Sequence, residues 1–139
     1  MTITFLHPYL SYAPLPLIHA RIQAGFPSPA DDYLEETLDL NEHLIEHPAA
    51  TFFARVQGES MIDAGIHEGD LLVIDRAVTA KSYDLVVCVL DGDFTLKRIV
   101  FERESISLVP ANKDFPVLHV QPHQDFEVWG VVKHVIHSV

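Results

Sequence analysis

The chain has 139 residues, enough to bury one hydrophobic core, and we expect a single folded domain with a loosely attached end. Its 20 acidic and 9 basic side chains give a formal net charge of -11, which repels phosphate backbones, so direct nucleic-acid binding is not expected. The one cysteine, Cys88, excludes an internal disulfide and lies in the apolar run LVVCVL, which predicts a buried residue in a reducing cytoplasm.

The N-terminal segment, residues 1 to about 28, has neither a helical nor a strand period and is rich in proline, which predicts an extended arm. Prolines at positions 8, 14 and 16 would break an apolar helix, and no basic residue precedes Arg21, so an export signal is not expected. No stretch reaches the roughly 20 apolar residues that span a bilayer, and we expect a protein without a membrane segment.

The next segment begins with a helix-start signal. Ser28 is a suitable N-cap, Pro29 fits the first helical position and acidic residues follow in the first turn. The pattern predicts a helix, or a broken pair of short helices, that starts here and stops before Pro48. Within it, HLIEH at residues 43–47 matches an inverted zinc-peptidase motif with His43 and His47 on one helix face. Because the predicted helix ends directly after His47, at Pro48, and no third ligand follows at a helical spacing, a zinc site is the less favoured interpretation.

From Thr51 onward the chain consists of short runs rich in Val, Ile, Phe and Trp, separated by Gly, Asp, Asn and Pro. This spacing predicts a compact, mostly antiparallel β domain. The sequence LDGDF supplies an Asp-Gly turn, so a hairpin is expected around Asp91 and Gly92. The expected strands are TFFARVQG, DLLVIDR, DLVVCVL, DFTLKRIVFE, SISLVP, VLHV and FEVWGVVKHVIHSV.

Two residues are candidates for nucleophilic catalysis. Ser60 lies in the glycine-flanked turn GESM between two β runs, where backbone N–H groups can point outward, although turns also use serine for their own hydrogen bonds. No Ser-His-Asp spacing stands out, and Lys97 is the better candidate base. It shares a strand face with Thr95 and Ile99, where burial would favour the neutral amine. The alternative is an edge-strand lysine that guards against aggregation.

The run HVIH at residues 134–137 is a second possible metal motif. A spacing of three does not align His134 and His137 on one strand face, so no metal is expected from this pair. Neither a metal nor another cofactor is expected elsewhere.

Four features agree in order and spacing with a known family: the Ala24-Gly25 bond, the FPSPA segment, the GESM turn, and a lysine 37 positions after the serine (97 minus 60). From about residue 22 to the C-terminus the chain resembles the UmuD family of SOS mutagenesis proteins, relatives of the self-cleaving domain of the LexA repressor. The resemblance implies Ser60 as nucleophile, Lys97 as general base and cleavage between Ala24 and Gly25. One departure is Tyr83, where many relatives have glycine, which affects the local turn rather than the chemistry.

The implied fold is a mostly β, compact LexA- and signal-peptidase-like domain of the β-clip type, with a short N-terminal helical segment and an extended N-terminal arm. Residues 1–24 would be the arm removed by cleavage, residues 25–50 a linker with short helices, and residues 51–139 the peptidase-like domain. The resemblance also implies a cytoplasmic homodimer whose cleavage a RecA filament on single-stranded DNA stimulates. The trimmed protein would then associate with a UmuC-type Y-family DNA polymerase in translesion synthesis.

A different class of function is also compatible with these residues. In it the chain is a non-catalytic β binding or dimerisation module, Ser60 and Lys97 are structural, and the arm is a fixed docking segment. The two hypotheses differ in whether the chain is ever cut.

Overall fold

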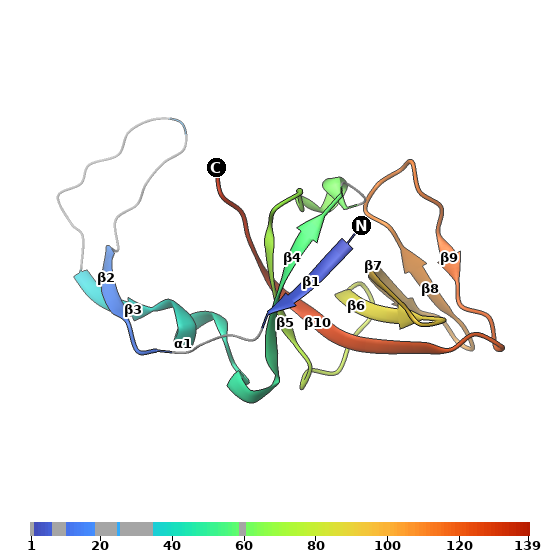
Figure 1. Cartoon of the computed structure of the whole chain (residues 1–139), viewed down its shortest axis with the longest axis horizontal. Coiled ribbons are helices and arrows are strands. Elements are labelled where there is room, and N and C mark those ends of the chain that lie inside the picture. The colour runs from blue at the N-terminus through green and yellow to red at the C-terminus, as the bar shows by residue number, and fades with distance from the viewer. Residues whose placement is uncertain (1, 7–10, 19–24, 26–34, 59–60) are drawn as a thin grey trace. The chain divides into compact units, whose positions relative to one another are not determined.

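A computed structural model describes residues 2–6, 11–18, 25, 35–58 and 61–139 of the chain (Figure 1). The chain divides into two compact units. The larger unit comprises Met1–Pro8 and His47–Val139, and the smaller comprises Tyr9–Glu46.

The larger unit is built on one antiparallel sheet, which confirms the mostly β fold (Figure 1). Its eight strands among the described residues follow the order β1-β4-β5-β10-β6-β7-β8-β9. They are β1 (Thr2–Leu6), β4 (Thr51–Gln57), β5 (Leu71–Asp75), β6 (Leu85–Leu90), β7 (Asp93–Phe101), β8 (Ile106–Val109), β9 (Leu118–His119) and β10 (Phe126–Ile136). Two 3-10 turns, η1 (Pro48–Ala50) and η2 (Ile62–Ala64), flank β4.

Strand β10 joins the two halves of this sheet. Its first part pairs with β6 and its second part with β5, so that Val131 is in register with both Val86 and Asp75. The register shifts on either side of this point, and a β-bulge of this kind bends a strand. Gly130 lies at the bend, and a Cβ there would meet Ile74 Cγ2 at 2.6 Å, so the close approach of β5 requires glycine.

Alternation along the strands produces two buried clusters. The first consists of Ala54, Val56, Met61, Ile66, Leu72, Ile74, Leu85, Val87 and Leu96. The second consists of Val86, Cys88, Ile99, Leu108 and Val131. Cys88 is fully buried, as its apolar surroundings in the sequence predicted.

The predicted hairpin is confirmed. β6 and β7 pair antiparallel from Leu90 and Asp93 onward, and the two residues between them form the turn. Asp91 and Gly92 have φ values of 49° and 86°. Positive φ at both central positions is the type I′ arrangement, whose twist matches the flanking strands.

The smaller unit differs from the helix that the sequence predicted. Ser28 and Pro29 lie outside the described residues, and Glu35–Asp39 form strand β3, paired with β2 (Pro14–Ile18). The helix α1 is only Leu40–Leu44, and the Asp39 side chain accepts a hydrogen bond from the Asn41 N–H at its start. Helix propensity alone stabilises a short helix only weakly. In Glu35–Asp39, pairing with the proline-rich strand β2 outweighs this helix propensity.

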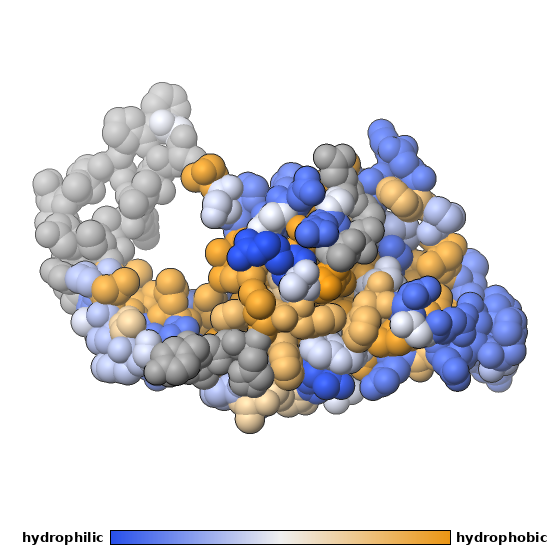
Figure 2. Space-filling model, in the orientation of Figure 1, coloured by the Kyte–Doolittle hydropathy of each residue, from blue (hydrophilic) through white to orange (hydrophobic). Residues whose placement is uncertain are grey.

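The surface of the larger unit carries several apolar side chains. Figure 2 shows hydrophobic residues reaching the surface among hydrophilic ones. Phe94, Phe101 and Phe115 are each more than a third exposed. Within the described part of the chain, no helix has the length and hydropathy to cross a membrane.

Candidate functional site

The predicted site lies partly outside the described residues. Ser60 and Ala24 both fall there, so their geometry stays a prediction. Gly25 is described and is exposed, with no atom within 4 Å of the position a Cβ would occupy. The residues around Ser60 and the strand of Lys97 are described and define the local framework.

The turn that carries Ser60 is anchored on its C-terminal side by Met61. This side chain is fully buried, and its Sδ accepts a hydrogen bond from the Ala111 N–H at 3.4 Å. The Ala111 carbonyl in turn accepts from the Asp63 N–H at 2.7 Å. These contacts fix the segment after Ser60 against the chain that follows β8.

Backbone hydrogen bonds join the two ends of the segment that contains Ser60, between Val56 and Asp70. The Gly69 N–H donates to the Val56 carbonyl at 2.8 Å, and the Val56 N–H donates to the Asp70 carbonyl at 2.9 Å. Gly58, the first residue after β4, has a φ of 96°, a conformation that favours glycine. The glycine before Ser60 therefore has a backbone role in turning the chain out of β4.

Lys97 lies in the middle of β7, in register with Val86 of β6. Its neighbour Leu96 is buried in the first cluster and Ile99 in the second, which confirms the predicted alternation of faces. The Lys97 side chain is half-buried rather than at a solvated rim. Among the described residues, no carboxylate forms an ion pair with it.

Burial lowers the pKa of Lys97 below its ordinary value of 10.5, and a weaker electrostatic interaction with Cys88 opposes this shift. Burial raises the pKa of the Cys88 thiol to about 11, so at neutral pH the thiol is protonated. The charged form of the lysine is thus partly desolvated and has no fixed counter-ion among the described side chains. This is the environment in which a lysine serves as a proton acceptor.

The segments that carry Ser60 and Lys97 meet in the core. Met61, the residue after Ser60, and Leu96, the residue before Lys97, belong to the same buried cluster. Ala111, which bonds the Met61 sulfur, packs against that cluster as well. This cluster therefore holds the sequence neighbours of both candidate residues, whereas Lys97 itself lies on the face of β7 opposite to Leu96.

Tyr83 holds the conformation that a glycine would adopt freely. Its φ is 75°, and hydrogen bonds fix it on both sides. Its N–H donates to the Ile99 carbonyl at 2.7 Å, and its carbonyl accepts from Arg98 Nη1 at 2.9 Å. Tyr83, where the resemblance to the family leads us to expect glycine, thus has a left-handed backbone.

The helical zinc motif does not form. α1 ends at Leu44, so His47 lies outside the helix and cannot share a helix face with His43. His47 instead pairs its Nδ1 with Asp75 Oδ2 at 2.6 Å, and Asp75 is buried. The reason is the early end of the helix: Ile45, the C-cap residue, is already extended, with a φ of -116° and a ψ of 106°.

Sequence reasoning missed a cluster of His67, Asp70 and His137, whose side chains converge in the larger unit. His137 and Asp70 are 67 positions apart in the chain, so no local motif signals their contact.

Comparison with known proteins confirms the resemblance drawn from the motifs. A family profile described as peptidase S24-like matches residues 16–133. Protein MucA of Salmonella typhimurium is 47% identical over 121 residues, which cover 86% of this chain and 82% of that protein. Protein ImpA of Salmonella typhimurium is 48% identical over 123 residues, which cover 88% of this chain and 83% of that protein.

A more distant relative is the LexA repressor of Verminephrobacter eiseniae. It is 37% identical over 124 residues, which cover 89% of this chain and 54% of the repressor. The region matched by the family profile, residues 16–133, includes both Ser60 and Lys97. The chain belongs to the peptidase S24-like family, among the UmuD-type SOS mutagenesis proteins and with the LexA repressors as more distant relatives.

Proposed function

We propose that this protein cleaves its own chain between Ala24 and Gly25, with Ser60 as the nucleophile and Lys97 as the general base. The observation that carries the proposal is Lys97 itself, a half-buried lysine on β7 whose pKa burial lowers. Membership of the peptidase S24-like family supports the assignment of both residues.

The chemistry needs only groups of this chain and water. The Ser60 hydroxyl attacks the Ala24 carbonyl carbon while the neutral Lys97 amine takes the hydroxyl proton. The Ala24–Gly25 amide bond then breaks, and the proton passes from the lysine to the Gly25 nitrogen. Water hydrolyses the ester on Ser60 and restores the hydroxyl. The small side chains on both sides of the bond leave its carbonyl open to attack, and backbone N–H groups near Ser60 would stabilise the oxyanion.

In the cell, cleavage would be part of the SOS response. A cytoplasmic homodimer would be cut slowly until a RecA filament on single-stranded DNA favours the docked arm, which is a shift of population rather than new chemistry. Residues 25–139 would then act as the accessory subunit of a UmuC-type Y-family polymerase. The net charge of -11 agrees with this role, because the partners rather than this chain would contact DNA.

Cleavage would also release a strand. β1 pairs with β4 from Thr2 to Leu6, and Phe5 packs on Trp129 with ring centroids 4.5 Å apart. Strand β1, with Phe5, precedes the proposed cut, whereas Trp129, the one tryptophan of the chain, follows it. Loss of residues 1–24 would therefore expose the β4 edge and Trp129. We expect its fluorescence to shift to longer wavelength after cleavage, and an unchanged spectrum of the fully cut protein would contradict the release of β1.

Variants of the two catalytic residues test the proposal, each with a matched control. Ser60→Ala and Lys97→Ala should stay whole under alkaline conditions that cut the wild-type protein, as followed by intact mass spectrometry. Ser138→Ala and Lys81→Ala change the same residue types at exposed positions and should be cut like the wild type. Cleavage at the same bond in Ser60→Ala would refute the assignment.

The binding-module hypothesis predicts a different result. In it the wild-type chain stays whole, even with a RecA filament on single-stranded DNA, and Lys97→Ala leaves partner binding unaffected. A wild-type chain that remains intact under both stimuli would favour that function over self-cleavage.

A further inference from the structure

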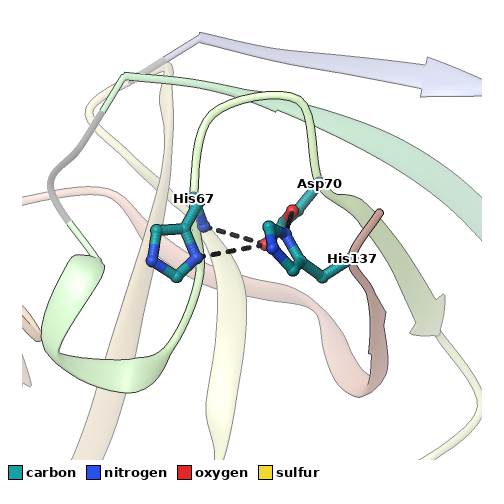
Figure 3. Close-up of side chains that lie close together, drawn as sticks. All are labelled: His67, Asp70 and His137. Atoms are coloured by element: carbon teal, nitrogen blue, oxygen red, sulfur yellow. Dashed lines mark hydrogen bonds and ion pairs between the residues drawn. The ribbon is translucent and has the colours of Figure 1, made fainter. Parts of the chain in front are cut away.

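We propose that His67, Asp70 and His137 form a binding site for one divalent transition-metal ion of the zinc type (Figure 3). The three side chains each offer one ligand atom, and these atoms lie within 4.8 Å of one another. The inference does not depend on self-cleavage, because none of the three residues takes part in the proposed reaction.

The fold places these residues together through the β5–β10 register. Leu71 at the start of β5 is paired with Ile136 at the end of β10, so the residues just outside this pair, Asp70 and His137, lie side by side. His67 precedes Asp70 by three positions in a turn closed by the Asp70 N–H and the His67 carbonyl at 3.1 Å. The site therefore brings together the turn before β5 and the end of β10.

The carboxylate of Asp70 is the centre of the arrangement. Its Oδ1 is 2.6 Å from His137 Nδ1, and its Oδ2 is 3.9 Å from His67 Nδ1. The Oδ2 atom also accepts a hydrogen bond from the His67 N–H at 2.8 Å, which orients the carboxylate. The two imidazole rings lie next to each other, with centroids 5.1 Å apart (Figure 3).

These separations suit a tetrahedral ion. With metal–nitrogen and metal–oxygen bonds of about 2.0–2.1 Å, neighbouring ligand atoms around zinc lie about 3.3 Å apart. The two nitrogen–oxygen distances, measured to different oxygens of Asp70, lie on either side of this value, and the three ligand atoms lie within 4.8 Å of one another, so rotation of the exposed imidazoles would be needed to surround an ion. Three protein ligands leave a fourth position for water.

Exposure and charge favour an ion at this position. Asp70 is only 2% exposed, whereas the side chains of His67 and His137 are 54% and 46% exposed. A fixed, buried carboxylate is thus covered by two imidazoles that an ion can reach from solvent. Two nitrogen ligands and one oxygen ligand suit zinc, cobalt, nickel or copper better than magnesium or calcium, which prefer oxygen.

A bound ion would join two separate parts of the chain. His137 follows the last residue of β10, and His67 lies in the segment that leads from Met61 to β5. The metal would therefore tie the C-terminal end to the segment that begins next to Ser60, and binding to the folded state alone would raise the midpoint of thermal unfolding.

Zinc titration of the full-length protein, without an affinity tag and after treatment with a chelator, tests the site. Calorimetry gives the affinity, native mass spectrometry gives the stoichiometry, and cobalt as a substitute gives visible absorption that reports the coordination. His67→Ala and His137→Ala remove one ligand each from exposed positions. His123→Ala and His119→Ala change exposed histidines that belong to no such cluster among the described side chains.

We expect one zinc ion per chain, an affinity lowered more than about tenfold in His67→Ala and in His137→Ala, and no change in the two controls. Zinc should raise the thermal midpoint of the wild type and not that of His137→Ala. Far-ultraviolet circular dichroism would verify that the variants are folded. A wild-type chain that retains no zinc, or equal affinities in the wild type and both ligand variants, would overturn the proposal.

Discussion

Replacement of Tyr83 by glycine is expected to stabilise the protein. Tyr83 has a φ of 75° and is 70% exposed, so the side chain gains little from packing while its Cβ strains the backbone. The backbone around it is held by the hydrogen bonds to Ile99 and from Arg98, which oppose a relaxation of the turn. Glycine removes the strain and keeps these bonds, because both involve only the main chain of residue 83.

The magnitude follows from two opposing terms. A left-handed backbone costs a residue with a Cβ about 1–2 kcal/mol. Glycine offsets about 0.4–1 kcal/mol of this gain in stability, because it increases the conformational entropy of the unfolded chain. The free energy of unfolding should therefore rise by roughly 1 kcal/mol. With a urea dependence of about 2 kcal/mol per molar, the unfolding midpoint would move up by about 0.5 M.

Tyr83→Ala is the matched control for this measurement. It removes the same exposed ring but keeps the Cβ, so the strain remains and no stabilisation is expected. Both variants would be compared with the parent by urea unfolding followed by circular dichroism, in a Ser60→Ala background that, under the proposed mechanism, keeps the chain whole. If Tyr83→Gly is no more stable than Tyr83→Ala, the strain argument is wrong.

Three further predictions concern buried groups. Gly130→Ala should lower the free energy of unfolding by about 1–3 kcal/mol, because the new Cβ would clash with Ile74, and a urea midpoint equal to that of the wild type would contradict this. Cys88, whose thiol pKa burial raises to about 11, should resist maleimide at neutral pH until the chain is unfolded, and rapid labelling of the native protein would argue against its burial. Lys97→Met should raise the free energy of unfolding of the Ser60→Ala protein at neutral pH, because the folded state disfavours the lysine charge. This advantage of methionine should shrink as the pH rises from the lowered folded-state pKa of Lys97 toward 10.5, because the lysine loses its proton first in the folded state. A difference in unfolding free energy that does not depend on pH would count against the burial effect.

The features that could be predicted from sequence are those with a local signal. The Asp91-Gly92 dipeptide fixed the hairpin because a type I′ turn needs positive φ at both positions. The period of two along β7 placed Leu96 and Ile99 on opposite faces and left Lys97 among apolar neighbours. Local rules succeed here because sheet geometry imposes the same alternation on every strand.

Other features depend on partners far away in the chain. Glu35–Asp39 have helix-forming neighbours yet form a strand, because Pro14–Ile18 offer an extended edge to pair with. The cluster of His67, Asp70 and His137 arises from the β5–β10 register, which no short motif encodes. The left-handed backbone of Tyr83 has no signal in its own residue type, since a tyrosine does not indicate positive φ.

The rate of self-cleavage as a function of pH tests the central claim most directly. Intact mass spectrometry would follow the appearance of the fragment Gly25–Val139 in the wild type and in Lys97→Ala. Because the pKa of Lys97 is lowered, the wild-type rate should rise with pH and level off below the ordinary lysine value of 10.5, while Lys97→Ala stays uncut at every pH. A rate that does not depend on pH, or an equal rate in Lys97→Ala, would contradict the serine-lysine mechanism.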